Sequence, residues 1–478
     1  MPTQEIHKHH LHAIFHQITT LLEKQEIVNA LVRKQDMPRQ NLVESLVARQ
    51  HLVELEQKLK QLHPADIAYI LENLPLLQRR MVWDLVEVER YGAVLLEVSD
   101  AVRETLIEDL ERDELLDAAE HMDSDEIADL VPDLPKDMVL ELLTSLNSED
   151  RAQVQEVLTF PEGTVGALMD FDVVTVREDI KLEVVLRYLR LRGELPDQID
   201  QLFVVDRLGT LQGLLPLKDI LIHDPDIKVS EIMITKPIFF YTDENAREVA
   251  QAFERYDLIS APVVNIHHRL VGCIGVDMVM DFVSEQNQRE RLGQAGLHEG
   301  EDLFAPIWKS AKNRWLWLAL NLMTAFIASR IIGVFEETIA ILVALASLMP
   351  IVASIGGNTG NQTAALIIRG LALNQINTTN FMHLLFKELS ISLLNGLLLG
   401  STVGLFAYLL YQKYTLGLVM MAAMMLNLFL AALAGIFIPV GLHKLGRDPV
   451  MGSSVLLTFL TDSMGFFIFL GLASLFLL

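Results

Sequence analysis

Five long apolar stretches in the last third of the chain constrain its fold more than any other feature. A helix needs about 20 apolar residues to cross the roughly 30 Å of hydrocarbon in a bilayer. The stretches that are long enough lie at about 315–335, 338–368, 389–411, 416–442 and 450–478. We therefore expect a lipid bilayer around this part of the chain, and an all-α transmembrane domain of five helices over residues 313–478.

Charged residues are divided unevenly along the chain. Of 38 Lys and Arg residues only six lie in 315–478, and of 63 Asp and Glu residues only five. Residues 1–314 therefore hold 32 basic and 58 acidic residues, a charge of −26 against −25 for the whole chain, and should be soluble and acidic. Such an excess of acid argues against a nucleic-acid partner, because phosphates need Lys and Arg. It suits either small cations or simple solubility.

The basic residues near the apolar stretches predict an orientation. They precede the first stretch and separate the second from the third and the fourth from the fifth: Lys309, Lys312, Arg314, Arg369, Lys387, Lys444 and Arg447. Short loops rich in Lys and Arg stay in the cytoplasm. We expect a multi-pass protein of the cell inner (plasma) membrane, with the soluble half cytoplasmic and the C-terminus outside.

The second apolar stretch contains residues that are unusual inside a membrane. Pro350 is followed by the run 354–362, which holds three glycines and the amides Asn358, Asn361 and Gln362. Irregular backbone at this depth is tolerated only where protein covers it or water lines it. We therefore expect a broken helix that borders a pore. Close helix packing through small residues is the alternative.

Asp462 is the only acid near the middle of any apolar stretch. A carboxylate there is costly and indicates a functional site by default, although it can also cap a neighbouring helix. Oxygen ligands suit hard cations, and Mg²⁺ is typically held by one or two carboxylates while it keeps several waters. The sequence therefore favours Mg²⁺, and a dimer would bring two copies of Asp462 together on one axis.

Two further clusters suggest metals less directly. The fourth stretch carries Met420, Met421, Met424 and Met425, and thioethers favour Cu(I). Methionine is also a flexible packing residue, which is the other interpretation. The N-terminus carries His7, His9, His10, His12 and His16. These histidines either bind a metal or lie at the solvated start of a helix.

Residues 1–158 are predicted to form an N-terminal α-superhelical domain, because apolar residues recur at spacings of three and four. The segments 63–75 and 123–135 resemble each other, as expected of stacked helix pairs. Asp123, Asp125 and Glu126 open the second segment. They are candidates for a regulatory metal site, but an Asp in this position is more often a helix N-cap.

Residues 159–284 change to short β-branched runs that alternate with helices. The runs are 173–176, 202–205, 238–241 and 262–264, and they recur after about sixty residues. This pattern resembles a tandem pair of α/β CBS modules, which often sense adenine nucleotides or ions. A charged segment at 285–312 is expected to be a plug helix that connects them to the first membrane helix. The chain is thus predicted to be a multidomain membrane protein.

The whole order resembles the MgtE family of magnesium transporters. The resemblance covers about residues 40–478 and is strongest in 350–362, 446–449 and 461–463. It implies a homodimeric, Mg²⁺-selective channel that imports magnesium and is gated by intracellular Mg²⁺. Asp462 would lie on the pore axis, and Asp448 near the cytoplasmic mouth. The expected pore residues are Gly357 through its carbonyl, Asn358, Asn361, Asp448 and Asp462.

The resemblance also implies acids at the end of the second CBS module and on the plug helix, where Mg²⁺ holds the closed state. Asp277, Asp281 and Glu290 match that pattern, whereas Met278, Gln286 and Arg289 stand where acids are usual. We therefore expect a weaker or rearranged closed state. The expected ligands of regulatory Mg²⁺ are Asp123, Asp125, Glu126, Asp277, Asp281 and Glu290.

The signature with which CBS modules bind ribose is degraded in this chain. It is a Ser or Thr followed three residues later by Asp. Here Pro216 precedes Asp219 in the first module, and Gly275 precedes Met278 in the second. We therefore do not expect adenine nucleotide to bind.

A passive Mg²⁺ channel is the leading interpretation of these features. The alternatives are a divalent metal transporter coupled to H⁺ or Na⁺, and a membrane-tethered ion sensor that conducts nothing. An enzyme is not expected, because the sequence contains no nucleophile–base pair, phosphate-binding loop or HExxH motif.

Overall fold

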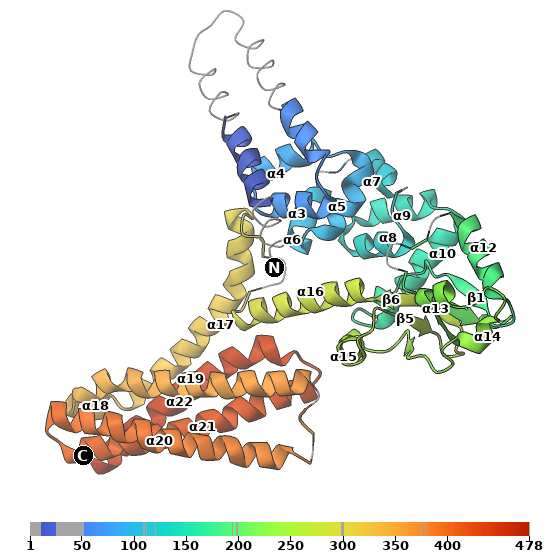
Figure 1. Ribbon diagram of the computed structural model, residues 1–478. Coiled ribbons are helices and arrows are strands. Elements are labelled where there is room, and N and C mark those ends of the chain that lie inside the picture. The colour runs from blue at the N-terminus through green and yellow to red at the C-terminus, as the bar shows by residue number, and fades with distance from the viewer. Residues whose placement is uncertain are drawn as a thin grey trace, which may run out of the picture. The chain divides into compact units, whose positions relative to one another are not determined.

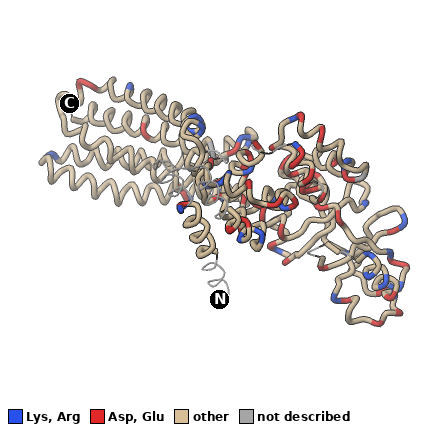
Figure 2. Tube along the Cα trace, turned by 90° about the horizontal axis from the view of Figure 1, so that it is seen from above, with Lys and Arg blue, Asp and Glu red and all other residues tan. Residues whose placement is uncertain are grey.

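A computed structural model describes residues 11–24, 52–108, 110, 112–119, 121–193, 195–196, 199–297, 301–373, 375–377 and 379–477. The chain folds into two compact units, shown in Figure 1. The first comprises Met1–Asn287 and Asp302–Ala305, and the second comprises Gln288–Glu301 and Pro306–Leu478. Charged residues are frequent along the chain of the first unit and sparse along the long helices of the second (Figure 2).

The first unit begins with short helices and contains no strand before residue 175 among its described residues. Residues 11–24 and 52–59 are helical. The helices that follow are α3 (Pro64–Glu72), α4 (Leu76–Trp83), α5 (Tyr91–Glu97), α6 (Asp100–Ile107), α7 (Arg112–Ala119), α8 (Ser124–Leu130), α9 (Lys136–Ser145) and α10 (Ser148–Val157), with 3₁₀ turns at Val88–Arg90 and Val131–Asp133. Their apolar faces share one core, in which Ile67, Ile70 and Leu71 are fully buried. The predicted α-superhelical domain is confirmed.

The repeat within these helices has a structural counterpart. Leu74 and Leu134 are both buried at the ends of equivalent segments. Pro75 and Pro135 then stand at the N-caps of α4 and α9. Proline has a fixed φ that is compatible with the start of a helix, and in both copies it stands directly before the next helix.

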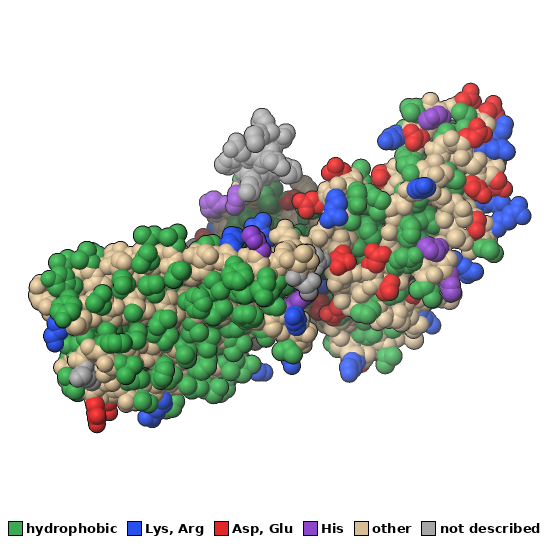
Figure 3. Space-filling view, turned by 90° about the horizontal axis from the view of Figure 1, so that it is seen from below, with side chains coloured by type: hydrophobic (Ala, Val, Ile, Leu, Met, Phe, Trp, Pro, Cys, Tyr) green, Lys and Arg blue, Asp and Glu red, His purple; other side chains and the backbone are tan. Residues whose placement is uncertain are grey.

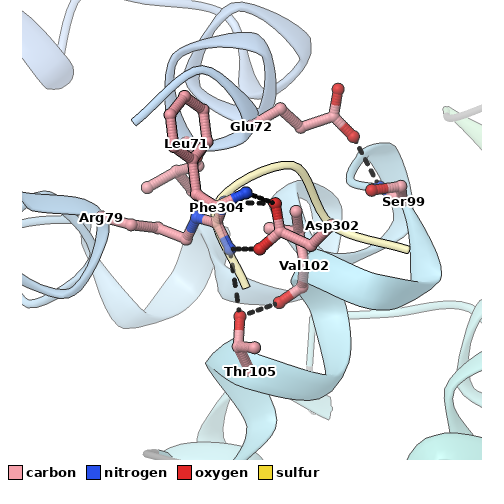
Figure 4. Close-up of polar contacts among 8 residues, drawn as sticks. All are labelled: Leu71, Glu72, Arg79, Ser99, Val102, Thr105, Asp302 and Phe304. Atoms are coloured by element: carbon pink, nitrogen blue, oxygen red, sulfur yellow. Dashed lines mark hydrogen bonds and ion pairs between the residues drawn. The ribbon is translucent and has the colours of Figure 1, made fainter. Parts of the chain in front are cut away.

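A buried ion pair holds the segment Asp302–Ala305 within the first unit. The Arg79 guanidinium on α4 donates to both Asp302 carboxylate oxygens, at 2.7 and 3.2 Å (Figure 4). Its Nε donates to the Leu71 carbonyl at 2.9 Å, and Nη1 reaches Thr105 Oγ1 at 3.4 Å. Arg79 is 0% and Asp302 8% exposed, so the pair is shielded from water.

Residues 159–287 form two similar sheets. In the first, β1 (Thr175–Arg177) lies parallel to β2 (Gln201–Val205), which pairs antiparallel with β3 (Leu211–Pro216). In the second, β4 (Phe240–Tyr241), β5 (Ser260–Val264) and β6 (Leu270–Gly275) repeat that order. The crossovers are α12 (Leu182–Arg192) and α15 (Ala246–Tyr256); the short helices α11 (Val165–Leu168), α13 (Leu217–Ile222) and α14 (Val229–Ile232) complete the modules.

The four β-branched runs predicted from the sequence correspond to β1, β2, β4 and β5, whereas β3 and β6 were not predicted as strands. Each of these two contains a glycine, which has low strand propensity. A Cβ on Gly213 would lie 2.6 Å from the Ile234 carbonyl oxygen, and one on Gly272 would lie 2.5 Å from that of Asp170. The glycines are therefore explained by close backbone approach.

The connecting helix differs from its predicted bounds. Helix α16 (Val276–Gln294) starts directly after β6, not near residue 285. It ends before Gly296, whose φ of +73° is in the left-handed region that favours glycine. Residues 307–312, expected in the same helix, belong to α17 (Ile307–Val334) instead.

The second unit is built on five long helices and one short one. After α17 come α18 (Glu336–Ile341), α19 (Ala344–Ala372), α20 (Phe381–Tyr411), α21 (Tyr414–Lys444) and α22 (Pro449–Phe476). Four are long and apolar enough to cross a membrane, namely α17, α20, α21 and residues 452–476 of α22. α19 is as long, with 29 residues, but has no segment that is apolar enough to be counted with them. Apolar side chains cover much of this unit's surface in Figure 3.

The expected break in the second apolar stretch is wrong in position. α19 is helical through Pro350 and the whole glycine-rich run. The interruption lies earlier, at Leu342 and Val343 between α18 and α19. The helix continues through the three glycines, and two of them, Gly356 and Gly360, lie where it packs closely on its neighbours, as the alternative interpretation held.

Helices α20 and α21 also pack through glycine. A Cβ on Gly396 would lie 3.0 Å from Met425 Cα, and one on Gly400 would lie 3.0 Å from the Met421 carbonyl oxygen. Met420 and Met424 are fully buried. These contacts favour the packing interpretation of the methionines over a copper site.

Candidate metal site

The predicted pore residues lie on two helices, α19 and α22, that contact each other. A Cβ on Gly360 would lie 2.3 Å from Leu457 Cδ2, and one on Gly357 would lie 3.7 Å from Thr461 Oγ1. The contacts run in opposite directions along the two helices, since Gly357 meets Thr461 and the later Gly360 meets the earlier Leu457. The two helices therefore run antiparallel where they touch.

This geometry turns Asn358, Asn361 and Asp462 to one side of the helix pair. Each of them directly follows a contact residue, and one residue rotates an α-helix by about 100°. Because the helices are antiparallel, the rotation after each contact carries the next residue to the same flank on both. Asn358 and Asn361 are exposed there, and Asp462 is half-buried.

The flank presents oxygen ligands without a basic residue bound to them. Among the described residues no ion pair or hydrogen bond to the Asp462 carboxylate is present. Carboxylate and amide oxygens suit hard cations such as Mg²⁺. In the described part of the chain, no three His, Cys, Asp or Glu side chains converge as a metal site. One carboxylate with two amides thus resembles a site for a hydrated ion more than a closed cage.

Asp448 lies apart from this flank, at the start of α22. Its side chain accepts a hydrogen bond from the Val450 amide at 2.8 Å and caps the helix. Fourteen residues of helix separate it from Asp462, which corresponds to about 21 Å along the axis. The structure therefore does not bring these two acids together within one chain.

Glu388 is a buried carboxylate that the sequence analysis missed. It lies on α20, is 5% exposed, and accepts a hydrogen bond from Thr363 Oγ1 of α19 at 3.3 Å. Lys387 Nζ is 3.9 Å from its other oxygen. The third apolar stretch begins at residue 389, one residue too late to include Glu388. The helix begins at Phe381, so Glu388 lies two turns inside it.

The predicted regulatory acids lie at several places in the first unit. Asp123 and Glu126 form a capping box at the start of α8, in which Glu126 accepts from the Asp123 amide at 2.9 Å. These two residues therefore follow the helix-capping interpretation and not that of metal ligands. Asp281 is exposed on α16, and Glu290 lies farther along that helix, in the second unit.

Asp170, which was not predicted, lies close enough to Asp125 and to Asp277 for their charges to interact. Burial, with a further contribution from the Asp170 carboxylate, raises the pKa of Asp125 to about 7. Burial also raises the pKa of Asp170, with Asp172, Asp123 and Asp277 adding to the effect. Oδ1 of Asp277 is buried and has no hydrogen-bond partner in the described part of the chain. The fold thus gathers negative charge between α8 and the second CBS module.

The raised pKa of Asp125 predicts a pH-dependent stability. A carboxyl whose pKa is 3.8 unfolded and about 7 folded binds its proton more tightly when folded. Its contribution is therefore fully present below about pH 4 and is lost as the pH rises through 7. We expect the unfolding midpoint of the full-length protein, without divalent cations, to fall between pH 5 and 8.

The variant Asp125→Asn should remove much of that fall, and should stabilise the protein above pH 7 by no more than about 4 kcal/mol. Thermal unfolding of both proteins across the pH range measures the difference. Asp243→Asn, which removes an exposed acid of the same unit, is the matched control. Parallel curves for wild type and Asp125→Asn would contradict the assignment.

Only part of the histidine cluster can be placed. His7, His9 and His10 lie outside the described residues. His12 and His16 lie on the helix 11–24, where His12 stands edge-on to the Tyr69 ring with centroids 6.3 Å apart. This arrangement fits a solvated helix.

Family models match most of the described chain, apart mainly from residues 286–348. Residues 349–472 match MgtE, a divalent cation transporter, and residues 62–163 match the MgtE intracellular N domain. Residues 165–225 and 229–285 match the CBS domain.

Curated relatives of similar length give the same result. The magnesium transporter MgtE of Thermus thermophilus is 32% identical over 433 residues, covering 88% of this chain and 95% of the relative. The MgtE of Bacillus subtilis is 28% identical over 417 residues, covering 87% of this chain and 92% of the relative.

Two solved structures are similar to the first unit. One is the cytosolic domain of the Mg²⁺ channel MgtE in complex with ATP, with 31% identity, a TM-score of 0.45, and coverage of 49% of this chain and 98% of that one. The other is the soluble part of a magnesium transporter, with 20% identity, a TM-score of 0.46, and coverage of 57% and 99%.

Proposed function

Because the chain belongs to the MgtE family of magnesium transporters, we propose that it is a Mg²⁺-selective channel that imports magnesium. Its relatives are transporters, and it is not an enzyme. The observation that best supports a pore is the shared flank of α19 and α22, where Asp462 faces the same side as Asn358 and Asn361. Asp462 attracts the hydrated ion, and the amides bond to its water shell. The Gly357 carbonyl completes the wall.

The channel is proposed to be a homodimer. One chain exposes the amides of α19 on a helix that is less apolar than its neighbours. Lipid cannot satisfy such groups, so a second copy or a water-filled passage must cover them. A two-fold axis along this flank brings two Asp462 carboxylates near one ion, the number of carboxylates with which Mg²⁺ is typically held.

We propose that the protein lies in the cell inner membrane, with its N-terminal half in the cytoplasm and its C-terminus outside. The proposed division is 1–158 for the N domain, 159–284 for the CBS pair, 285–312 for the connecting segment and 313–478 for the membrane domain. Asp448 then lies near the cytoplasmic mouth. This topology follows from the basic residues beside the membrane helices.

Gating is proposed to respond to intracellular Mg²⁺ in the cytoplasmic domains. Asp125, Asp170 and Asp277 repel one another when ionised, and a divalent cation relieves that repulsion. Asp123, Glu126, Asp281 and Glu290 supply further acids nearby in sequence. Adenine nucleotide is left out of the proposal, because Pro216 and Gly275 stand where a CBS module places its ribose-binding hydroxyl.

Flux into proteoliposomes that contain a Mg²⁺-sensitive dye tests the proposed function. We expect wild-type protein to admit Mg²⁺ down its own gradient, with or without a proton or sodium gradient, and to be inhibited by Mg²⁺ on the cytoplasmic side. Flux that requires the second gradient would instead identify a coupled transporter. Complete absence of flux would favour a membrane-tethered sensor.

A further inference from the structure

We propose that Asn427 is a positioning residue for ion conduction. Its amide sets the register between α19 and α22, and thereby the placement of Asn358, Asn361 and Asp462 on their shared flank. The inference rests on the proposed function, since it concerns the same ion pathway. It adds a residue on a third helix, α21, which contributes no ligand of its own.

Asn427 is a polar side chain held entirely inside the membrane unit. It is 0% exposed, and its Nδ2 donates a hydrogen bond to the Val352 carbonyl of α19 at 2.9 Å. That carbonyl lies one helical turn before Gly356. The bond therefore ties α21 to α19 directly beside the glycine-rich run.

Two glycines on different helices make room for this amide. A Cβ on Gly356 of α19 would lie 2.2 Å from Asn427 Nδ2, and one on Gly465 of α22 would lie 2.9 Å from the same atom. Neither distance leaves space for a methyl group. One side chain on α21 is thus in contact with the backbones of both helices that carry the proposed ion ligands.

If stability alone determined the residue at position 427, an apolar side chain would be expected there. Oδ1 of Asn427 is buried and has no hydrogen-bond partner in the described part of the chain. An unpartnered buried oxygen is destabilising, and a leucine, which has the same branched arrangement of heavy atoms, would avoid that cost. What the amide has and a leucine lacks is a directional hydrogen bond to α19. This bond fixes the position of α21 along α19 as well as the distance between the two helices.

The position fixed by the Asn427 hydrogen bond matters because Mg²⁺ requires a precise arrangement of its ligands. Gly356 lies two residues before Asn358, and Gly465 lies three residues after Asp462. A shift at either glycine therefore moves a proposed ligand on the same or the next helical turn. Mg²⁺ tolerates little departure from octahedral geometry, whereas Ca²⁺ accepts flexible surroundings. Loosening the register should affect Mg²⁺ more than Ca²⁺.

The test compares flux in proteoliposomes for wild type, Asn427→Leu and Gly465→Ala, each normalised to folded protein in the membrane. We expect the Mg²⁺ concentration for half-maximal flux to rise roughly tenfold in Asn427→Leu, as the loss of a buried hydrogen bond predicts. The ratio of Mg²⁺ to Ca²⁺ flux should fall in both variants. Gly465→Ala keeps the amide but displaces it, and so decides the matter if Asn427→Leu does not fold.

Asn321→Leu is the matched control. Asn321 lies on α17, and its Nδ2 donates to the Trp317 carbonyl of its own helix at 3.1 Å, so it ties no helices together. It should keep the wild-type half-maximal concentration and ion ratio. A purely structural role for Asn427 would lower the amount of folded protein but leave both quantities unchanged, and that result would overturn the inference. Wild-type flux alone tests the proposed function, so the two failures are distinguishable.

Discussion

Asp462→Asn is expected to lower the Mg²⁺ flux through the protein by roughly ten- to a hundredfold. The substitution keeps the shape and the hydrogen-bonding capacity of the side chain but removes its charge. Interactions with a charged group contribute about 1.5–3 kcal/mol, which corresponds to that range. The flux is measured in proteoliposomes at equal protein density, with the cytoplasmic-side Mg²⁺ kept low so that gating does not limit it.

A control must separate the loss of this carboxylate from a general loss of negative charge. Glu337→Gln makes the same chemical change at an exposed acid of the same unit, in the short helix α18. It should leave the flux unchanged within a factor of about two. If Asp462→Asn conducts as well as Glu337→Gln, the carboxylate is not the key ligand. The family assignment would stand, but the proposed pore mechanism would not.

The membrane unit shows why the helices were predicted better than their contacts. Length and apolarity identify a spanning helix, and both are local properties of the sequence. The role of a glycine is not local. From the sequence, Gly356 and Gly360 are compatible both with a broken helix and with a close helix contact. The positions of the neighbouring Asn427 and Leu457 are needed to decide between the two. Glu388 was missed for a similar reason, because the end of an apolar run does not locate the end of its helix.

The first unit shows the same division between local and distant information. The capping box of Asp123 and Glu126 could be anticipated, since both residues belong to one turn of one helix. The approach of Asp170 to Asp125 could not, because they come from different domains. β3 and β6 lacked a strand signal, since Gly213 and Gly272 serve contacts with segments distant in sequence.

Breaking the ion pair between Arg79 and Asp302 is expected to have the second large effect. Arg79→Ala would leave the Asp302 carboxylate buried without its partner, which costs about 3–5 kcal/mol. The same change removes the bonds to the Leu71 carbonyl and to Thr105. We expect a lower unfolding midpoint for the first unit. We also expect faster amide hydrogen exchange in residues 302–305, since the Phe304 amide donates to the Asp302 carboxylate at 2.9 Å.

The expected loss of stability depends on the burial of the ion pair and not on its mere presence, and the chain offers a control for that distinction. Arg112 pairs with Asp137 and Glu141, but its side chain is 55% exposed. Exposed pairs contribute about 0–1 kcal/mol, so Arg112→Ala should be nearly neutral. Replacing both buried partners, as in Arg79→Met with Asp302→Leu, should recover much of the stability lost in Arg79→Ala, because no uncompensated charge remains. Equal and small effects of Arg79→Ala and Arg112→Ala would show that water reaches Asp302, and the segment 302–305 would then be held by its apolar contacts alone.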